Sequence, residues 1–418
     1  MTLPFLGLAT FLAFVYFEPS IWFPFVAEYR IALVVAIVTL ILTLLSGGRI
    51  PQAIQNPLLL LLLASAAIST LFSLSPDNSY AHLVLLLKAG SLYFLMTMIL
   101  SLPGNLVRSF YIILTYASLA SFATLLAAKL GYFAPGYATP YRLVALLGGV
   151  GDGPNEFGAM MAAFFPIPIA LLEGQKSLPK RALLLTVALS FLRCLTRTRS
   201  RGAFLGLLTT ATIMLWEYRK RSGILLLLFL FAAFAFFNTH EAFWERISAL
   251  ESAETIQADA PAYDRLQQIL FAIQLISLRP ITGVGLDSFV RAKIDLLGLD
   301  PASTITQHVP HNAYLGIGAE IGLPAMLAFI LLIAISIAQS YSSEALFKTR
   351  IDLFHLYRIT KGIRLGLIGL AISILFLSEQ YNSLLYQLIA FTVCLRHLAQ
   401  QHTKPMTSGQ KQSATSHA

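Results

Sequence analysis

Long runs of apolar residues, separated by short polar stretches, extend along almost the whole chain. A helix needs about 17–22 mainly apolar residues to cross a bilayer, and the runs predict about twelve such helices. The predicted spans are residues 3–17, 31–47, 57–74, 81–100, 106–128, 156–173, 181–196, 202–217, 223–238, 312–339, 364–378 and 382–398. Transmembrane β-strands would instead show short segments of alternating polarity. The pattern therefore predicts an all-α, polytopic membrane protein.

The composition agrees with a membrane protein and narrows the choice of partners. Hydrophobic residues make up 57% of the 418 residues and charged residues only 12%, against roughly 25% charged residues in soluble domains. The net charge of +9 comes without a basic segment interleaved with aromatic residues, so we expect membrane lipids and not nucleic acid as partners. Cys194 and Cys394 are predicted at opposite membrane faces, which argues against a disulfide and excludes a cysteine-based metal site.

The distribution of basic residues predicts the orientation in the membrane. Arg and Lys gather in alternate loops, for example at 176–181, 219–221 and 348–364, and such loops are cytoplasmic. Both termini are then cytoplasmic, and the polar tail, residues 399–418, is expected to be disordered.

Two features of the outer side depart from this pattern. Four arginines gather between residues 193 and 201, where positive charge is disfavoured. The loop between spans nine and ten, residues 239–311, is far longer than the others, and such loops are usually functional. We therefore divide the chain into spans one to nine (1–238), the outer loop (239–311), spans ten to twelve (312–398) and the tail (399–418).

The outer loop has helical patterning. Its residues 261–279 begin with a proline and carry apolar side chains at helical spacing, namely Leu266, Ile269, Leu270, Ile273 and Ile276, which predicts an amphipathic helix. A glycine turn and a short helix follow. Asn312 is an expected N-cap for span ten, which places His311 at the mouth of a membrane helix.

Four stretches together resemble the O-antigen ligase / O-antigen polymerase superfamily. They are "GPNEFGAMMAAFFPIPIA" (153–170), "TRSRGAFLGLL" (198–208), "RPITGVGLDSF" (279–289) and "HNAYLGIGAEIGLPAMLAF" (311–329). Their order and spacing match as well, with the large outer loop between spans nine and ten. The resemblance covers roughly residues 150–335.

The resemblance implies a GT-C-like fold and a metal-independent glycosyltransferase, without cofactor, at the periplasmic face of the bacterial inner membrane. The implied donor is a glycan linked to undecaprenyl diphosphate. The acceptor is lipid A–core in a ligase, or another lipid-linked glycan in an O-antigen or exopolysaccharide polymerase. A single outer domain with one His-Asn block resembles the ligases slightly more.

The resemblance gives the outer arginines a role. Guanidinium groups bind phosphate oxygens in bidentate fashion and can stabilise charge that develops on a leaving diphosphate. We expect Arg201 and Arg265 to bind the diphosphate, with Arg197, Arg199 and Arg279 as further substrate-binding residues. The alternative is that outer arginines bind lipid headgroups, and for Arg193 the two interpretations are equally open.

His311 is the candidate general base, because histidine titrates near neutral pH and can accept the proton of an attacking hydroxyl. It could instead orient the acceptor or cap the helix. His308 is a second candidate, with a solvated loop histidine as its alternative.

Further polar residues lie at or inside the predicted spans. Asn155, Asn312 and Glu320 are substrate-binding candidates, although Glu320 could pair with an arginine and the asparagines could cap helices. Lys88 lies within span four and can extend to the headgroups. Gly283 and Gly285 favour a tight turn over a phosphate cradle, since no βαβ unit surrounds them.

A transporter or flippase is the rival class. A major-facilitator transporter would carry its long loop between spans six and seven and show similar halves, and neither feature is present. A flippase would line a central cavity with charge, whereas here charge gathers at one outer rim. The sequence contains no Walker motif, no Asp-x-Asp and no metal-spaced His/Cys set, so we expect no bound metal.

Overall fold

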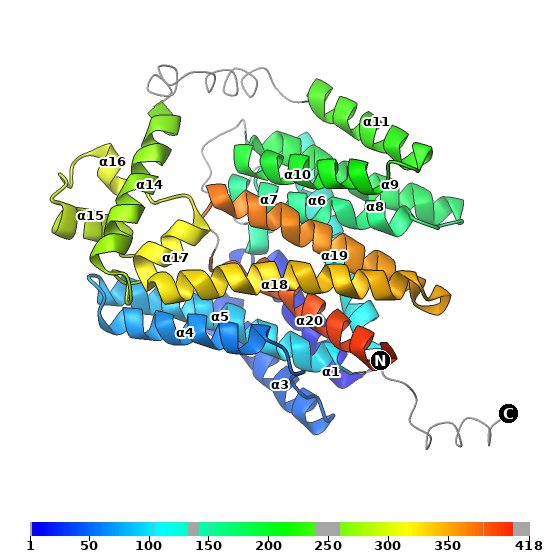
Figure 1. Cartoon of the computed structure of the whole chain (residues 1–418), viewed down its shortest axis with the longest axis horizontal. Helices are drawn as coiled ribbons and strands as arrows, with labels where there is room; N and C mark the ends of the chain where they lie inside the picture. Colours follow the sequence, from blue (N-terminus) through cyan, green and yellow to red (C-terminus); the bar gives the residue numbers. More distant parts are fainter. Residues whose placement is uncertain are drawn as a thin grey trace.

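The structure, a computed structural model, describes residues 2–102, 104–132, 142–151, 153–238, 260–378 and 380–403. Within these ranges all regular elements are helical, so the all-α prediction is confirmed (Figure 1). The helices are α1 (Leu3–Phe17), α2 (Phe25–Glu28), α3 (Ile31–Leu45), α4 (Gln55–Leu71), α5 (Pro76–Leu100), α6 (Asn105–Lys129), α7 (Pro154–Phe164), α8 (Pro166–Leu172), α9 (Leu178–Thr198), α10 (Arg201–Glu217), α11 (Ser222–Asn238), α14 (Ala260–Leu278), α15 (Phe289–Leu297), α16 (Thr304–Gln307), α17 (Ala313–Ile321), α18 (Leu323–Lys348), α19 (Phe354–Ser373) and α20 (Ser383–Thr403), with short 3-10 turns η1 (Pro19–Ile21), η2 (Gly149–Gly151), η3 (Ile351–Leu353) and η4 (Ile374–Phe376).

Within the described ranges, five segments are long and apolar enough to cross a membrane. They are Pro76–Leu100, Asn105–Lys129, Pro154–Leu172, Leu323–Lys348 and Ile351–Phe376, and shorter apolar helices occupy Leu3–Phe17, Ile31–Leu45, Gln55–Leu71 and Ser222–Phe234. These segments support a membrane protein. The count of twelve spans, the four-part division and the position of the 239–311 loop outside the membrane stay predictions.

The single span predicted at residues 312–339 is wrong, because two helices occupy it. Gly322 separates α17 from α18 with φ 101° and ψ 168°, a conformation essentially limited to glycine. A Cβ there would also collide with the backbone of Ile281. The break lets residues 280–281 pass directly against the chain, and the Leu323 amide donates to the Pro280 carbonyl at 2.7 Å.

The predicted start of span eleven, at residue 364, is also wrong, since α19 begins ten residues earlier. The charges in this stretch interrupt the apolar pattern, but in the fold they are neutralised. Arg364 is fully buried and donates to Glu344 at 2.7 Å and to Glu217 at 2.8 Å. Lys361 lies 3.3 Å from Glu217. Together with Glu173, which lies 3.5 Å from Lys361, these side chains form an ion-pair cluster.

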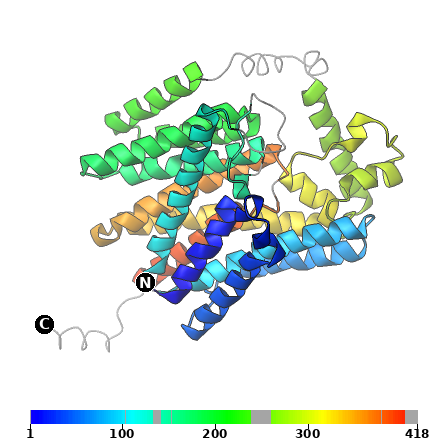
Figure 2. The ribbon, with the colours of Figure 1, turned by 180° about the vertical axis from the view of Figure 1, so that it is seen from behind.

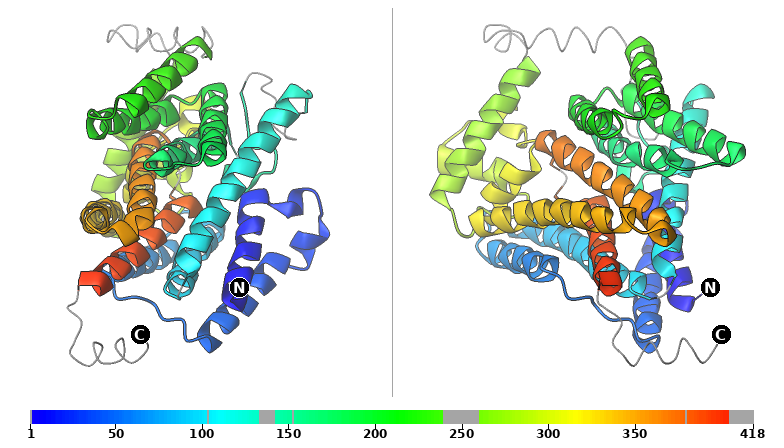
Figure 3. Two further views of the ribbon diagram at one scale, coloured as in Figure 1. Left: turned by 90° about the vertical axis from the view of Figure 1, so that its right-hand side faces the viewer. Right: turned by 45° about the vertical axis from the view of Figure 1, so that its right-hand side comes forward.

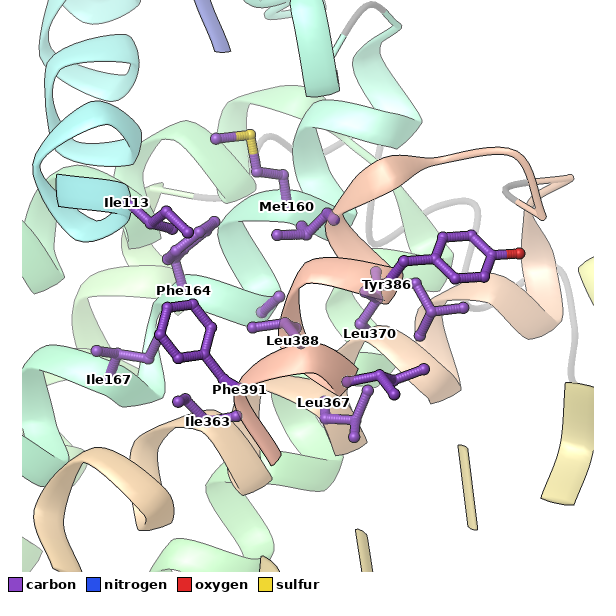
Figure 4. Packing of buried hydrophobic residues seen from close by; sticks show 14 of the residues in the cluster. Ile113, Met160, Phe164, Ile167, Ile363, Leu367, Leu370, Tyr386, Leu388 and Phe391 are labelled. Carbon is purple, nitrogen blue, oxygen red and sulfur yellow. The ribbon is translucent and has the colours of Figure 1, made fainter. Parts of the chain in front are cut away.

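The central helices pack through small residues and a large apolar core. Gly206 of α10 packs directly on Gly369 of α19, as is common where membrane helices approach closely. Figure 4 shows Met160 and Phe164 of α7, Ile363 of α19 and Leu388 of α20 within this core. The arrangement holds α7, α10, α19 and α20 together as the centre of the molecule.

A smaller helical unit, α14 to α17, lies at one end of the central helices (Figures 1 and 2). The expected helix at 261–279 is confirmed as α14. Of its apolar stripe, Leu266, Leu270 and Ile273 are exposed, whereas Ala272 and Leu275 beside the stripe are buried. The small Ala272 joins a second apolar core with Val284, Phe289, Ala292 and Ala319, so close packing of α15 and α17 selects this face.

Candidate functional site

The arginine-rich stretch forms a sharp corner between two helices. Helix α9 ends at Thr198, Arg199 adopts a left-handed conformation with φ 53°, and α10 begins at Arg201. The Ser200 hydroxyl caps α10 by accepting a hydrogen bond from the Ala203 amide at 3.4 Å. Arg197, Arg199 and Arg201 are all half-buried. The N-terminus of α10 adds its dipole to these charges, which favours an anion at the corner.

Arg142 fastens the preceding loop to this corner. Its Nε donates to the Thr198 carbonyl at 2.9 Å, and a second guanidinium nitrogen donates to Asn155 Oδ1 at 2.6 Å. The Leu143 amide donates to the Arg197 carbonyl at 3.0 Å. The structure therefore brings Asn155, at the start of α7, to the arginine corner. Sequence reasoning missed Arg142, because no motif surrounds it.

A second group of polar residues surrounds His311. His308 Nδ1 lies 2.9 Å from Asp264 Oδ2, and Arg265 follows Asp264 on α14. Burial lowers the pKa of His311, and the charges of Arg265 and His308 lower it further while Asp264 opposes them. A lowered pKa favours the neutral imidazole, the form that can accept a proton. The structure places His311 within electrostatic reach of Arg265, Asp264 and His308.

Lys293, on α15, stabilises this group through hydrogen bonds to its side chains and backbone. Its fully buried ammonium donates to Gln268 Oε1 at 2.7 Å, to the His308 carbonyl at 2.7 Å and to the Ile305 carbonyl at 3.0 Å. Gln268 in turn donates to Asp264 at 3.0 Å. Burial lowers the pKa of Lys293 to about 8. The sequence analysis missed Asp264, Gln268 and Lys293. These residues and their partners lie on α14, α15 and α16, which meet only in the folded protein.

Asn312 has the predicted capping role. Its Oδ1 accepts a hydrogen bond from the Leu315 amide at 3.0 Å, which fixes the start of α17. His311, directly before it, has φ 45°, a conformation that is costly for a non-glycine residue. The cap and the strained backbone together set the direction in which the imidazole leaves the chain.

The turn with Gly283 and Gly285 has a structural role. The amides of Val284 and Gly285 donate to the carbonyls of Ala319 and Glu320, each at 3.0 Å, so they are not available to a phosphate. Glycine is needed because Gly283 has φ +66° and a Cβ there would collide with the backbone of Glu320. This geometry supports the interpretation as a tight turn.

Gly283→Ala should destabilise the protein by about 3 kcal/mol or more, because it combines backbone strain with a backbone clash. Gly298→Ala is the matched control, since Gly298 has φ +68° but no atom within 4 Å of the place that an added methyl group would occupy. We expect about 1 kcal/mol for this control. Thermal unfolding of both variants in detergent measures the difference, and equal losses would contradict the close packing of Gly283 on Glu320.

Glu320 lies in a separate polar cluster. Its Oε2 accepts a hydrogen bond from the Tyr381 hydroxyl at 3.2 Å, so the structure gives it a tyrosine as partner. The rings of Tyr381 and His82 lie 5.2 Å apart, and His82 lies 3.7 Å from Asp287. The sequence analysis missed this cluster, because His82 and Tyr381 carry no motif and lie far in sequence from Asp287, which ends the quoted glycine turn.

Arg279 lies away from the His311 group. It follows the C-terminus of α14, fourteen residues and so about 21 Å of helix rise beyond Arg265. Its guanidinium donates to the Phe72 carbonyl at 3.1 Å. This contact joins α14 to the end of α4, and its predicted role in substrate binding stays a prediction.

The arginine corner and the His311 group meet the same segment of the central helices. A Cβ on Gly202 of α10 would lie 2.8 Å from Phe376 Cβ, and the Tyr314 hydroxyl of α17 donates to the Ala371 carbonyl at 2.9 Å. Figure 1 shows one end of α19 between α10 and α17. The first turns of α10 and α17, which follow the arginine corner and His311, therefore contact residues 371–376.

Part of the chain matches a family of known proteins. Residues 184–330 match a family model described as O-antigen ligase. No curated protein matches the chain at a significant level. The matched range contains the arginine corner, α14 to α17 and every sequence-predicted site residue except Asn155. The match confirms the resemblance to the O-antigen ligase-like superfamily.

Proposed function

We propose that this O-antigen ligase-like protein is an inner-membrane glycosyltransferase that moves a glycan from undecaprenyl diphosphate to a sugar hydroxyl of lipid A–core at the periplasmic face. The family match supports a ligase or polymerase of lipid-linked glycans. The observation that carries the proposal is the group of His311, Arg265 and the His308–Asp264 pair within the matched range, in which burial and Arg265 lower the pKa of His311. A base and a fixed cation are the two groups that glycosyl transfer from a diphosphate requires.

In this proposal the arginines bind the donor. Arg201 and Arg265 contact the diphosphate from two sides, and Arg197 and Arg199 add positive charge at the start of α10. Guanidinium stays protonated at all relevant pH values and binds two oxygens at once. The negative charge that develops as the glycosidic bond breaks is therefore stabilised without a metal ion.

His311 acts on the acceptor. An acceptor hydroxyl oxygen attacks the anomeric carbon of the donor sugar, and the bond between this carbon and the diphosphate oxygen breaks. The hydroxyl proton passes to His311, and undecaprenyl diphosphate leaves with the bonding electron pair. Return of the proton to solvent regenerates the neutral imidazole. Asp264 and His308 would keep the loop that carries His311 in place.

A polymerase that uses the same donor is the alternative, since the family description does not separate the two acceptors, and a transporter or flippase is the more distant one. A deletion strain distinguishes them. Loss of a ligase leaves lipid A–core uncapped while long lipid-linked polymer accumulates, as seen by lipopolysaccharide electrophoresis. Cores that carry one repeat unit would identify a polymerase. If the deletion strain shows neither of these two patterns, the result contradicts glycosyl transfer.

A further inference from the structure

A large groove lies between α1, α3 and α5, apart from the arginine corner. Its volume is 1340 Å³, and most of its lining is apolar, with Val15, Ile37 and Leu92 as examples from the three helices. Figure 3 shows α1 and α3 as a hairpin next to the other helices. Polar side chains also line the groove, among them Glu18, Arg30, Tyr80, Lys88, Tyr381, Asn382 and Ser383.

Lys88 is the unusual member of this lining. It lies in a candidate membrane span, six residues and so about 9 Å of helix rise beyond His82, the last polar residue at the start of α5. Its side chain is exposed and forms no hydrogen bond or ion pair with the residues that the structure describes. A cation at such a depth is costly unless an anion accompanies it. Its aliphatic stem allows the ammonium to reach the level of lipid phosphates.

The other charges of the groove favour an anionic occupant. Arg30 faces the same groove and is exposed. Glu18, the carboxylate in the lining, accepts a hydrogen bond from the Gly149 amide at 2.8 Å. Two cations therefore face an apolar groove whose carboxylate already has a partner in the backbone. A lipid with apolar chains and a phosphate complements this combination.

The groove extends to the C-terminal end of α17, the helix that begins after His311. Tyr381 lines the groove and donates to Glu320 of α17, the helix that follows His311. On the other side, residues 142–149 lead from the arginine corner to Glu18, through the bonds of Arg142 to the Thr198 carbonyl and of Gly149 to Glu18. A lipid in the groove would thus present its headgroup toward α17.

We propose that this groove binds the lipid part of the acceptor, a phosphorylated glycolipid, with its acyl chains along α1, α3 and α5 and a phosphate at Lys88 and Arg30. The inference rests on the proposed function, because transfer between two membrane-anchored substrates requires two lipid sites. The arginine corner is assigned to the donor diphosphate. None of the corner arginines lines the groove, which leaves the groove to the acceptor.

The test uses the full chain in nanodiscs with lipid A–core as acceptor and undecaprenyl-diphosphate glycan as donor. Lys88→Glu should raise the KM for lipid A–core at least tenfold and leave the KM for the donor within twofold. Lys129→Ala, at the exposed end of the neighbouring α6, is the matched control and should change neither. An unchanged acceptor KM, or a raised donor KM instead, would overturn the assignment of the groove.

Native mass spectrometry gives a second readout that is independent of turnover. The wild-type protein should retain lipid A–core in the presence of excess phosphatidylglycerol, and Lys88→Glu should lose it. Displacement by phosphatidylglycerol would show that ordinary membrane lipid fills the groove and would overturn the proposal. Lys88-dependent retention without any transfer by the wild-type protein would refute the proposed function and leave the lipid site standing.

Discussion

Arg265→Ala and Arg201→Ala should each lower the rate of glycan transfer by about 10²–10³-fold, the effect of removing one group that stabilises developing negative charge. Both side chains are half-buried. In the proposed mechanism both contact the diphosphate and stabilise the negative charge that develops on it as the glycosidic bond breaks. Transfer measured with purified protein and a polyprenyl-diphosphate glycan tests this, together with expression level and thermal stability. Near-normal activity in both variants would refute the diphosphate site.

Matched controls lie on the same helical units. Arg291, on α15, pairs with Asp295 at 2.6 Å on the surface, and Arg219 lies just past the far end of α10. Alanine at either position should leave transfer within about twofold, since the Arg291–Asp295 ion pair is exposed and, among the described residues, Arg219 contacts only Trp216 next to it. Arg265→Lys should recover only part of the activity, because an ammonium keeps the charge but not the bidentate geometry.

His311→Ala should lower kcat by a factor of about 10² or more, as expected for loss of a general base. Because the pKa of His311 is lowered, the neutral base predominates at pH 7. Activity of the wild-type protein should therefore fall only as the pH drops below the usual range of histidine, and this acidic limb should be absent from the residual activity of the variant. A pH profile of kcat/KM measures both.

Two further variants show whether the effect belongs to the base. His355→Ala changes an exposed histidine at the start of α19 and should have no effect. Asp264→Asn removes a charge that raises the pKa of His311, so it should move the acidic limb to lower pH. If His311→Ala retains activity within a few-fold, His311 orients the acceptor and another group takes the proton.

Local sequence signals predicted the parts of the site that depend on neighbouring residues. Periodicity and prolines identified α14, the side chain of Asn312 identified the cap of α17, and paired glycines identified the turn at 283–285. Each of these features is decided within a few residues of the chain. The arginine corner was predicted in the same way, from charges that interrupt an apolar run.

The remainder depends on contacts between distant segments. Arg142, Lys293 and Tyr381 have partners 13 to 61 positions away. The residues around an isolated arginine, lysine or tyrosine form no pattern from which such a partner can be predicted. The break at Gly322 was missed for the same reason, since the residue that requires it is Ile281. The start of α19 was missed because its charges are neutralised by carboxylates from other helices.

The ion-pair cluster at the far end of α10 has a consequence for preorganisation. Glu217, the last residue of α10, pairs with Arg364 and Lys361 of α19, while Gly202, at the first turn of α10, packs against Ser373 and Phe376 at the opposite end. Both ends of α10 are thus fixed to the same neighbour, which prevents the two helices from sliding past each other. The position of Arg201 relative to residues 373–376 is therefore set when the protein folds and not when substrate arrives, so the entropy of aligning the arginine is lost before the reaction begins.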